Sequence, residues 1–224
     1  SYLGRLDGTL DFLLLQQLRA FIAFDLIGPA AFDRFLSRHL AYFPADFGLP
    51  SFLDNHDMNR FLWVCHGDTR RLKLAALLQF TLPHPPVIYY GTEVGLSQQH
   101  DLEYPDGSRR MEESRAPMLW DANQDSDLLA FYRDLIALRR AHSSLWRAER
   151  LPIELDERGL YVTSLGGEAM LALNRSPDSV TISAPTDVTI AVRTETGVTR
   201  DGANLRLPPL TGALLLPASK ETTA

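Results

Sequence analysis

The stretch Pro50-Ser51-Phe52-Leu53-Asp54-Asn55-His56-Asp57-Met58-Asn59-Arg60 joins an apolar run to a cluster of polar side chains. Phe52 and Leu53 have the composition of a short buried strand. Four residues that can hydrogen-bond follow at once, and two of them, Asp54 and Asp57, are carboxylates. Where parallel strands end in a pocket, the side chains at their carboxyl ends line it. The stretch therefore predicts a strand whose end carries a polar site.

On both sides of this stretch, helical and strand patterns alternate. Apolar residues at helical spacing predict helices over residues 14–22, 32–43, 69–81 and 126–142. Val87–Tyr90 has strand composition and follows the prolines that stop the third helix. The order helix, strand, helix, strand predicts parallel strands with crossover helices. A long polar segment over residues 95–125 predicts a functional or mobile loop.

From about Leu151 the pattern changes to short strands. Strand-like runs are divided by Gly, Pro, Asp and Asn, and they cover residues 160–165, 169–174, 188–194 and 213–216. We expect an all-β module of roughly 70 residues, a size that is stable when packed on a larger partner.

Composition excludes several classes of protein. Hydrophobic residues make up 45% of the 224, which excludes wholesale disorder. The net charge of -6 argues against a nucleic-acid partner, and no apolar run reaches the ~18 residues of a membrane span. Cys65 is the sole cysteine, so no intrachain disulfide forms. The start at Ser1 predicts a piece of a longer chain, and cytoplasmic and secreted locations both stay open.

Five segments resemble the α-amylase family (glycoside hydrolase family thirteen), in particular its neopullulanase, cyclomaltodextrinase and α-glucosidase-like branch. They are Tyr2–Phe12, similar to the family's sixth barrel strand; Pro50–Arg60, the seventh; Val87–Gly95 (VIYYGTEVG), the eighth; Arg115–Trp120, an R-x-P-M-x-W element; and Leu171–Arg175, part of the C-terminal domain. The implied fold class is α/β plus all-β. Residues 1–146 would form about the last three β/α units of a TIM (β/α)8 barrel, and residues 147–224 a small antiparallel β-sandwich.

The resemblance also implies a function. In this family the nucleophilic Asp and the general-acid Glu come from the fourth and fifth strands, and no substitute for either is evident here. The chain would then be the C-terminal part of a retaining hydrolase of α-1,4-glucosidic bonds, inactive alone. Asp57 matches the family's third acid, which stabilises the transition state. His56 would bind hydroxyls of an α-glucan or maltooligosaccharide substrate, and we also predict substrate contacts for Asn55 and Arg60.

Structural alternatives stand beside these site predictions. Asn55, His56 and Asp57 also suit an Asx-type turn that ends a strand. Arg60 either lines a subsite or bonds the loop, and Asp54 either supports the site or the fold. Glu93, Arg115 and Trp120 are expected to order loops rather than to touch substrate. We predict no cofactor and no catalytic metal; a structural calcium site stays open.

A second reading is a family relative that lost catalysis and serves as a scaffold or partner subunit. The intact His56–Asp57 pair favours the enzyme. Three strands cut from a barrel would leave unpaired edges and apolar surface, which predicts self-association into a homo-oligomer. The exact glucan, and hydrolysis as against transglycosylation, stay open.

Overall fold

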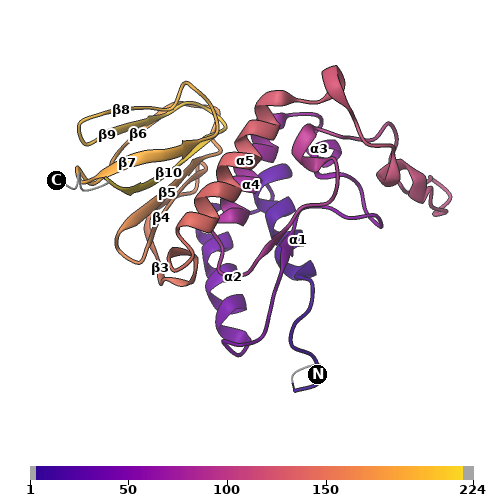
Figure 1. The fold of residues 1–224 in the computed structure, drawn as a ribbon, viewed down its shortest axis with the longest axis horizontal. Coiled ribbons are helices and arrows are strands. Elements are labelled where there is room, and N and C mark those ends of the chain that lie inside the picture. The colour runs from indigo at the N-terminus through magenta and orange to yellow at the C-terminus, as the bar shows by residue number, and fades with distance from the viewer. Residues whose placement is uncertain (1–3, 219–224) are drawn as a thin grey trace.

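The chain folds into a helical part and a β module that lie side by side, as the computed structural model of residues 4–218 shows (Figure 1). Its helical segments are α1 Phe12–Leu18, η1 Arg19–Ala23, α2 Pro29–Tyr42, α3 Phe61–Val64, α4 Thr69–Phe80, η2 Thr92–Val94, η3 Met111–Arg115, η4 Asp121–Asn123, α5 Ser126–Ala141 and η5 Leu145–Arg147. Its strands are β1 Ser51–Phe52, β2 Pro86–Val87, β3 Arg150–Asp156, β4 Leu160–Leu165, β5 Ala169–Asn174, β6 Val180–Ser183, β7 Val188–Arg193, β8 Thr199–Asp201, β9 Asn204–Leu207 and β10 Thr211–Pro217.

Capping residues set where the long helices begin. Asp68 accepts the backbone N–H of Arg70 before α4, and Asp125 accepts that of Leu128 before α5. Pro29 occupies the first turn of α2, where its missing N–H costs no hydrogen bond. The starts of α4 and α5 agree with the predicted helices, whereas α2 begins at Pro29, before the predicted start at residue 32. The first predicted helix differs, because after α1 it continues as a π-helical turn, η1.

The parallel strands form at the predicted places but are short. β1 pairs with β2 in parallel through Ser51 with Pro86 and Phe52 with Val87. The predicted strands at 50–53 and 87–90 therefore pair over two residues each, and within residues 4–218 this sheet has no third strand. The expected sixth-strand region contributes a single parallel bridge, Gly8 to Gly48, and Tyr2 lies outside the described residues.

The β module consists of two antiparallel sheets packed face to face. One has the order β3-β4-β5-β10-β7 and the other β6-β9-β8. Apolar side chains from both sheets form a common core, with Val162, Met170 and Leu215 from one and Leu205 and Leu207 from the other. The predicted β-sandwich is therefore present. The helices end at η5 and the module begins at Arg150; the division of domains between residues 146 and 147 stays a prediction.

The second face of the larger sheet packs on the helices. Tyr161, Leu171 and Leu214 belong to the same core as Phe21 and Leu74. Every side chain of β5 is buried, which explains why this strand is an apolar run rather than an alternating one. The module and the helical part therefore share one hydrophobic core.

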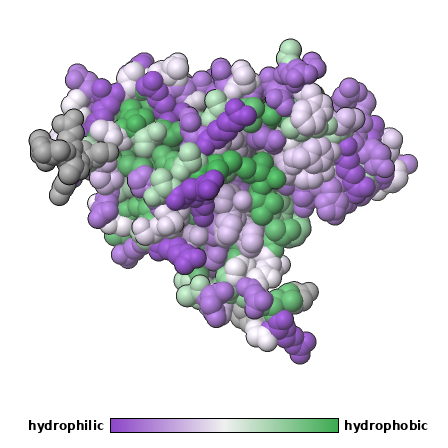
Figure 2. All heavy atoms as spheres, in the orientation of Figure 1, coloured by the Kyte–Doolittle hydropathy of each residue, from purple (hydrophilic) through white to green (hydrophobic). Residues whose placement is uncertain are grey.

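Apolar side chains also remain exposed on the helical part. They include Leu10, Phe12, Leu13, Val87 and Tyr90. Phe12 packs edge-on against Phe52 of β1, with 5.0 Å between ring centroids, so part of this surface lies next to the parallel strands. Figure 2 shows apolar surface across the middle of the face viewed. None of the helices in the described part of the chain has both the length and the apolar character of a membrane span.

Candidate active site

The polar stretch forms a loop between β1 and α3, residues 53–60, which is the candidate loop. Asp54 anchors it. The carboxylate of Asp54 accepts the backbone N–H of Phe61 at 2.8 Å and the hydroxyl of Thr92 at 2.8 Å. Thr92 follows β2, so the side chain of Asp54 links the segments that follow both parallel strands. Asp54 is 2% exposed, and this burial raises its pKa, against the lowering effect of the Phe61 and Thr92 hydrogen bonds and of nearby Arg60. Asp54 therefore supports the loop and does not face a ligand.

Asn55 makes the turn that was the structural alternative. Its Oδ1 accepts the backbone N–H of Asp57 at 2.8 Å, which is an Asx turn. The turn directs the chain so that His56 and Asp57 stand on the surface. Asn55 thus has a structural role, and its predicted contact with substrate stays a prediction.

His56 and Asp57 lie together and are accessible. Their side chains are 58% and 56% exposed, and His56 Nε2 lies 3.2 Å from Asp57 Oδ2. The other carboxylate oxygen, Oδ1, accepts from the guanidinium of Arg115 at 3.3 Å. The aspartate is therefore oriented by a neighbour while most of its surface stays open to solvent.

The long loop that follows η2 fixes the backbone of this pair. Arg115 and the hydroxyl of Ser114 donate to the carbonyl of His56 at 3.1 and 2.9 Å. Arg109 donates to the carbonyl of Asp57 at 2.8 Å. The expected ordering role of Arg115 is present, whereas Arg109 and Ser114 were not foreseen. Their only sequence signal is that they belong to the long polar segment.

Gln98 holds the far end of the loop. Its Oε1 accepts the backbone N–H of Arg60 at 2.7 Å, and its amide donates to Asn59 at 2.6 Å. Gln98 is 9% exposed, so these bonds are shielded from water. Nothing in the sequence distinguishes this glutamine from its neighbour Gln99.

Arg60 is buried beneath the loop. It is 0% exposed. Its guanidinium donates to the carbonyl of Tyr90 at 2.6 Å and lies 4.1 Å from the centre of the Tyr89 ring. The side chain turns inward beneath the end of β2, where the Tyr89 and Tyr90 rings lie against the guanidinium and one carbonyl accepts from Nη1. Its Nε and Nη2 are buried without a hydrogen-bond partner among the described residues. The geometry favours the alternative, bonding of the loop, and the predicted substrate contact of Arg60 stays a prediction.

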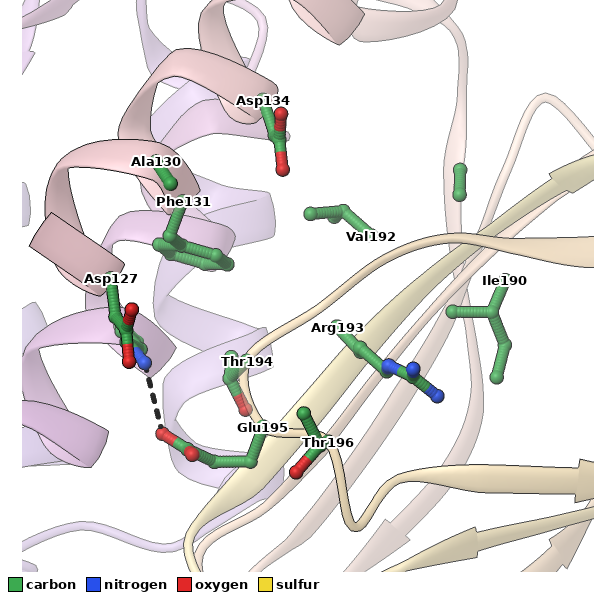
Figure 3. A pocket seen from close by; sticks show the side chains of 12 residues that line it. Asp127, Ala130, Phe131, Asp134, Ile190, Val192, Arg193, Thr194, Glu195 and Thr196 are labelled. Carbon is green, nitrogen blue, oxygen red and sulfur yellow. Dashed lines mark hydrogen bonds and ion pairs between the residues drawn. The ribbon is translucent and has the colours of Figure 1, made fainter.

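Of two pockets among the described residues, one adjoins the site. One, of about 610 Å³, lies beside the candidate loop and is lined by Leu96, Ser97, Gln98, Gln99, Glu112, Glu113, Ala116, Pro117 and Leu119. It is joined to the loop through Gln98. The other, of about 630 Å³, lies between α5 and β7 (Figure 3). Lys73 and Glu195 pair across it at 3.2 Å, and it holds no predicted site residue.

Within residues 4–218, no group of His, Cys, Asp or Glu side chains is arranged to hold a metal ion.

Comparisons with known proteins place the chain beside glucan-active enzymes. Residues 16–148 match the model "Alpha amylase, catalytic domain". The chain is 38% identical over 158 residues to alpha-amylase 2 of Dictyoglomus thermophilum, covering 70% of the chain and 28% of that protein. It is 37% identical over 142 residues to a cyclomaltodextrinase of a Bacillus species, covering 62% and 24%.

A solved structure is similar over nearly the whole chain. The ligand-free cyclic α-maltosyl-(1→6)-maltose hydrolase of Arthrobacter globiformis aligns with a TM-score of 0.74 and 26% identity, over 97% of this chain and 46% of that one. The predicted fold class, an incomplete β/α barrel followed by an antiparallel β-sandwich, is confirmed. The chain spans about a quarter of the two curated relatives and about half of the solved enzyme.

Proposed function

We propose, since the chain belongs to the alpha-amylase family of glycoside hydrolases, that it forms the C-terminal part of a retaining α-glucan hydrolase. The observation that carries the proposal is the accessible His56–Asp57 pair at the carboxyl end of β1, held in place by Arg115. In this proposal residues 1–146 complete a barrel with a preceding segment. Residues 147–224 brace the barrel from outside.

The proposed chemistry follows from the charge of Asp57. A retaining glycosidase passes through a transition state in which positive charge develops on the sugar. A fixed carboxylate beside that sugar stabilises the developing charge more than it stabilises the neutral substrate. Arg115 and the Asx turn of Asn55 hold Asp57 before substrate arrives, so orientation costs little during the reaction.

His56 and Asp57 have separate roles in the proposal. The imidazole of His56 is a hydrogen-bond donor to sugar hydroxyls at the cleavage point. Asp57 accepts hydrogen bonds from hydroxyls, and those bonds strengthen as the ring distorts. The covalent step needs a nucleophilic carboxylate and a carboxylic acid close together, and we assign neither to this chain. The alternative, a scaffold without catalysis, is less well supported because it needs no accessible pair of this kind.

The first prediction concerns the isolated chain. We expect no hydrolysis of maltooligosaccharides by residues 1–224, because an Asp57 carboxylate alone forms no glycosyl intermediate. Release of reducing sugar from maltoheptaose, followed chromatographically, is the measurement. The Asp57→Ala variant is the control. Turnover that persists through rigorous purification and disappears in that variant would refute the assignment.

A second prediction concerns association of the isolated chain. Exposed Leu10, Leu13 and Val87, next to the unextended β1–β2 pair, favour a homo-oligomer that covers this surface. Light scattering over a range of concentrations should give a mass above 25.1 kDa. Leu13→Lys should return the mass to that of one chain, whereas Tyr42→Lys, an exposed position on α2, should leave it unchanged. A monomer at every concentration would contradict the prediction.

A further inference from the structure

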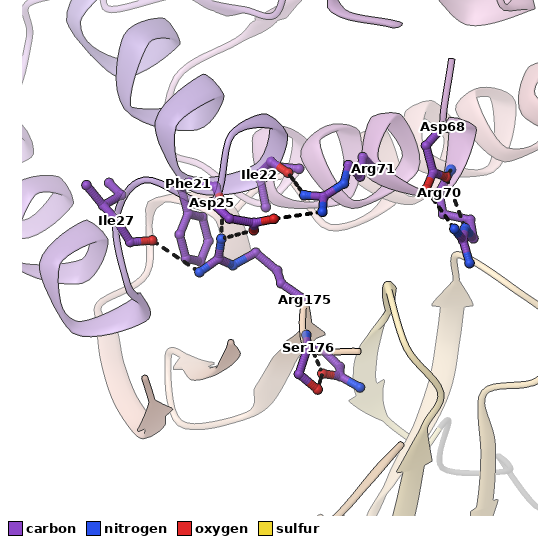
Figure 4. Close-up of polar contacts among 10 residues, drawn as sticks. Phe21, Ile22, Asp25, Ile27, Asp68, Arg70, Arg71, Arg175 and Ser176 are labelled. Atoms are coloured by element: carbon purple, nitrogen blue, oxygen red, sulfur yellow. Dashed lines mark hydrogen bonds and ion pairs between the residues drawn. The ribbon is translucent and has the colours of Figure 1, made fainter. Parts of the chain in front are cut away.

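The π-helical turn η1 lies between the β module and the candidate loop, and both are bonded to it. In η1 the backbone N–H of Phe24 bonds to the carbonyl of Arg19, five residues back, instead of four. Such wide turns are rare and occur often at functional sites. The carbonyls of Phe21 and Ile22 accept arginine side chains here (Figure 4). These bonds hold the turn in its wide form.

The first of these arginines comes from the β module. Arg175 follows β5, and its guanidinium donates to the carbonyl of Phe21, to Asp25 Oδ1 at 2.8 Å and to the carbonyl of Ile27 at 3.2 Å. It also lies 3.9 Å from the centre of the Phe21 ring. The residue is 8% exposed, and burial lowers its pKa to about 10, so it remains charged at neutral pH. Arg175 thus reaches across the shared core and binds the end of η1.

The second arginine secures the same end from α4. Arg71 donates to the carbonyl of Ile22 and to Asp25 Oδ2 at 2.7 Å. Asp25 therefore lies between two guanidinium groups, one on each carboxylate oxygen (Figure 4). Its backbone has φ 52°, a left-handed conformation that is strained for aspartate and that the two ion pairs stabilise.

The other end of η1 is bonded to the candidate loop. Arg19 is the first residue of the turn, and its guanidinium donates to the carbonyl of Asn59 at 2.7 Å and to that of Leu53 at 3.3 Å. These two carbonyls lie at opposite ends of the loop that carries His56 and Asp57. Arg19 therefore links the two ends of that loop.

We infer that Arg175 is a positioning residue for the His56–Asp57 pair, which acts through η1 and Arg19. Without the Arg175 bonds, the wide turn can relax to ordinary α-helix. Removing the extra residue from the turn rotates the residues on one side of it about the helix axis by about 100° relative to those on the other side. Arg19 would then lose its hydrogen bonds to the two ends of the loop. The functional meaning of this coupling rests on the proposed function, but the coupling itself is a property of the folded chain.

Amide hydrogen exchange of the full chain tests the inference without any assay of activity. The backbone N–H groups of Arg60 and Phe61 are buried and bonded to Gln98 and Asp54, so they report opening of the loop. Arg175→Ala should raise their exchange rates about tenfold, and Arg19→Met should do the same. Arg175→Lys should give a smaller rise, since an ammonium cannot serve all of the guanidinium's acceptors at once.

Glu195→Ala is the matched control. It removes another contact between the β module and the helical part, the pair with Lys73, and touches neither η1 nor the loop. It should leave the Arg60 and Phe61 amides at their original rates. Equal acceleration in Glu195→Ala and Arg175→Ala would overturn the inference, because ordinary loosening of the two parts would then explain both. Unchanged loop amides in Arg175→Ala would also overturn it, and Arg175→Lys decides the matter if the alanine variant does not fold.

Discussion

In the complete enzyme that we propose, Asp57→Asn should lower kcat on the order of 10³-fold, about 4 kcal/mol of transition-state stabilisation. The substitution keeps the size of the side chain and its ability to accept a hydrogen bond, but it removes the charge. A neutral ground state loses little from this change, whereas an oxocarbenium-like transition state loses the charge that stabilised it. Substrate dissociation constants should therefore rise much less than kcat falls.

Single-turnover kinetics with a maltooligosaccharide, together with binding measured by calorimetry, separate these two effects. Asp106→Asn is the control, since it removes one exposed carboxylate, which accepts hydrogen bonds from Ser108 in the long loop. That variant should keep both parameters. Equal losses of affinity and kcat in Asp57→Asn would mark Asp57 as an ordinary binding residue.

Asp54→Ala should lower the free energy of unfolding by about 3 kcal/mol, the second large effect. The substitution leaves the buried N–H of Phe61 and the hydroxyl of Thr92 without their acceptor, at about 1–3 kcal/mol each. Urea denaturation of the isolated chain at pH 7 measures the loss. Asp68→Ala is the comparison, because it removes a partly exposed helix cap worth about 1 kcal/mol. Similar losses in the two variants would contradict the anchoring role of Asp54.

The same residue predicts a pH dependence with a defined sign. Burial raises the pKa of Asp54 above the ordinary 3.8, so the native state holds more protons than the unfolded state above that pH. The Asp54 contribution is therefore largest below pH 3.8 and declines as pH rises through the folded pKa. The free energy of unfolding of the protein, relative to that of the Asp54→Asn variant, should fall as pH rises, because the amide of that variant does not titrate. A difference that grew with pH would mean a lowered pKa.

Asp68 should show the opposite sign. Hydrogen bonds from Arg70 lower its pKa below 3.8, so its contribution is present above that value and is lost as pH falls through the folded pKa. The two carboxylates differ in environment rather than in chemistry. Desolvation dominates at Asp54, whereas a charged donor dominates at Asp68.

Local patterns predicted the elements but not their extent. Helical periodicity placed α4 and α5, because this signal lies within the helix itself. The composition of 87–90 predicted a longer strand than β2, since pairing depends on a partner strand that composition does not describe. The π-helical turn η1 was not predicted, because arginines more than 45 residues away in sequence hold it.

By itself, the sequence determined where a polar site would form: at the abrupt change from Phe52 and Leu53 to Asn55, His56 and Asp57, where a strand has to end. Only the tertiary structure decided which of these polar groups remain accessible. Asp54 and Arg60 are as polar as their neighbours, yet both are buried, while His56 and Asp57 stay exposed. Asp54 is bonded to Phe61 and Thr92, and Arg60 to the carbonyl of Tyr90. The physical reason is that a charged side chain is stable in the interior only where donors or acceptors from distant segments meet it, and those segments come together only when the chain folds.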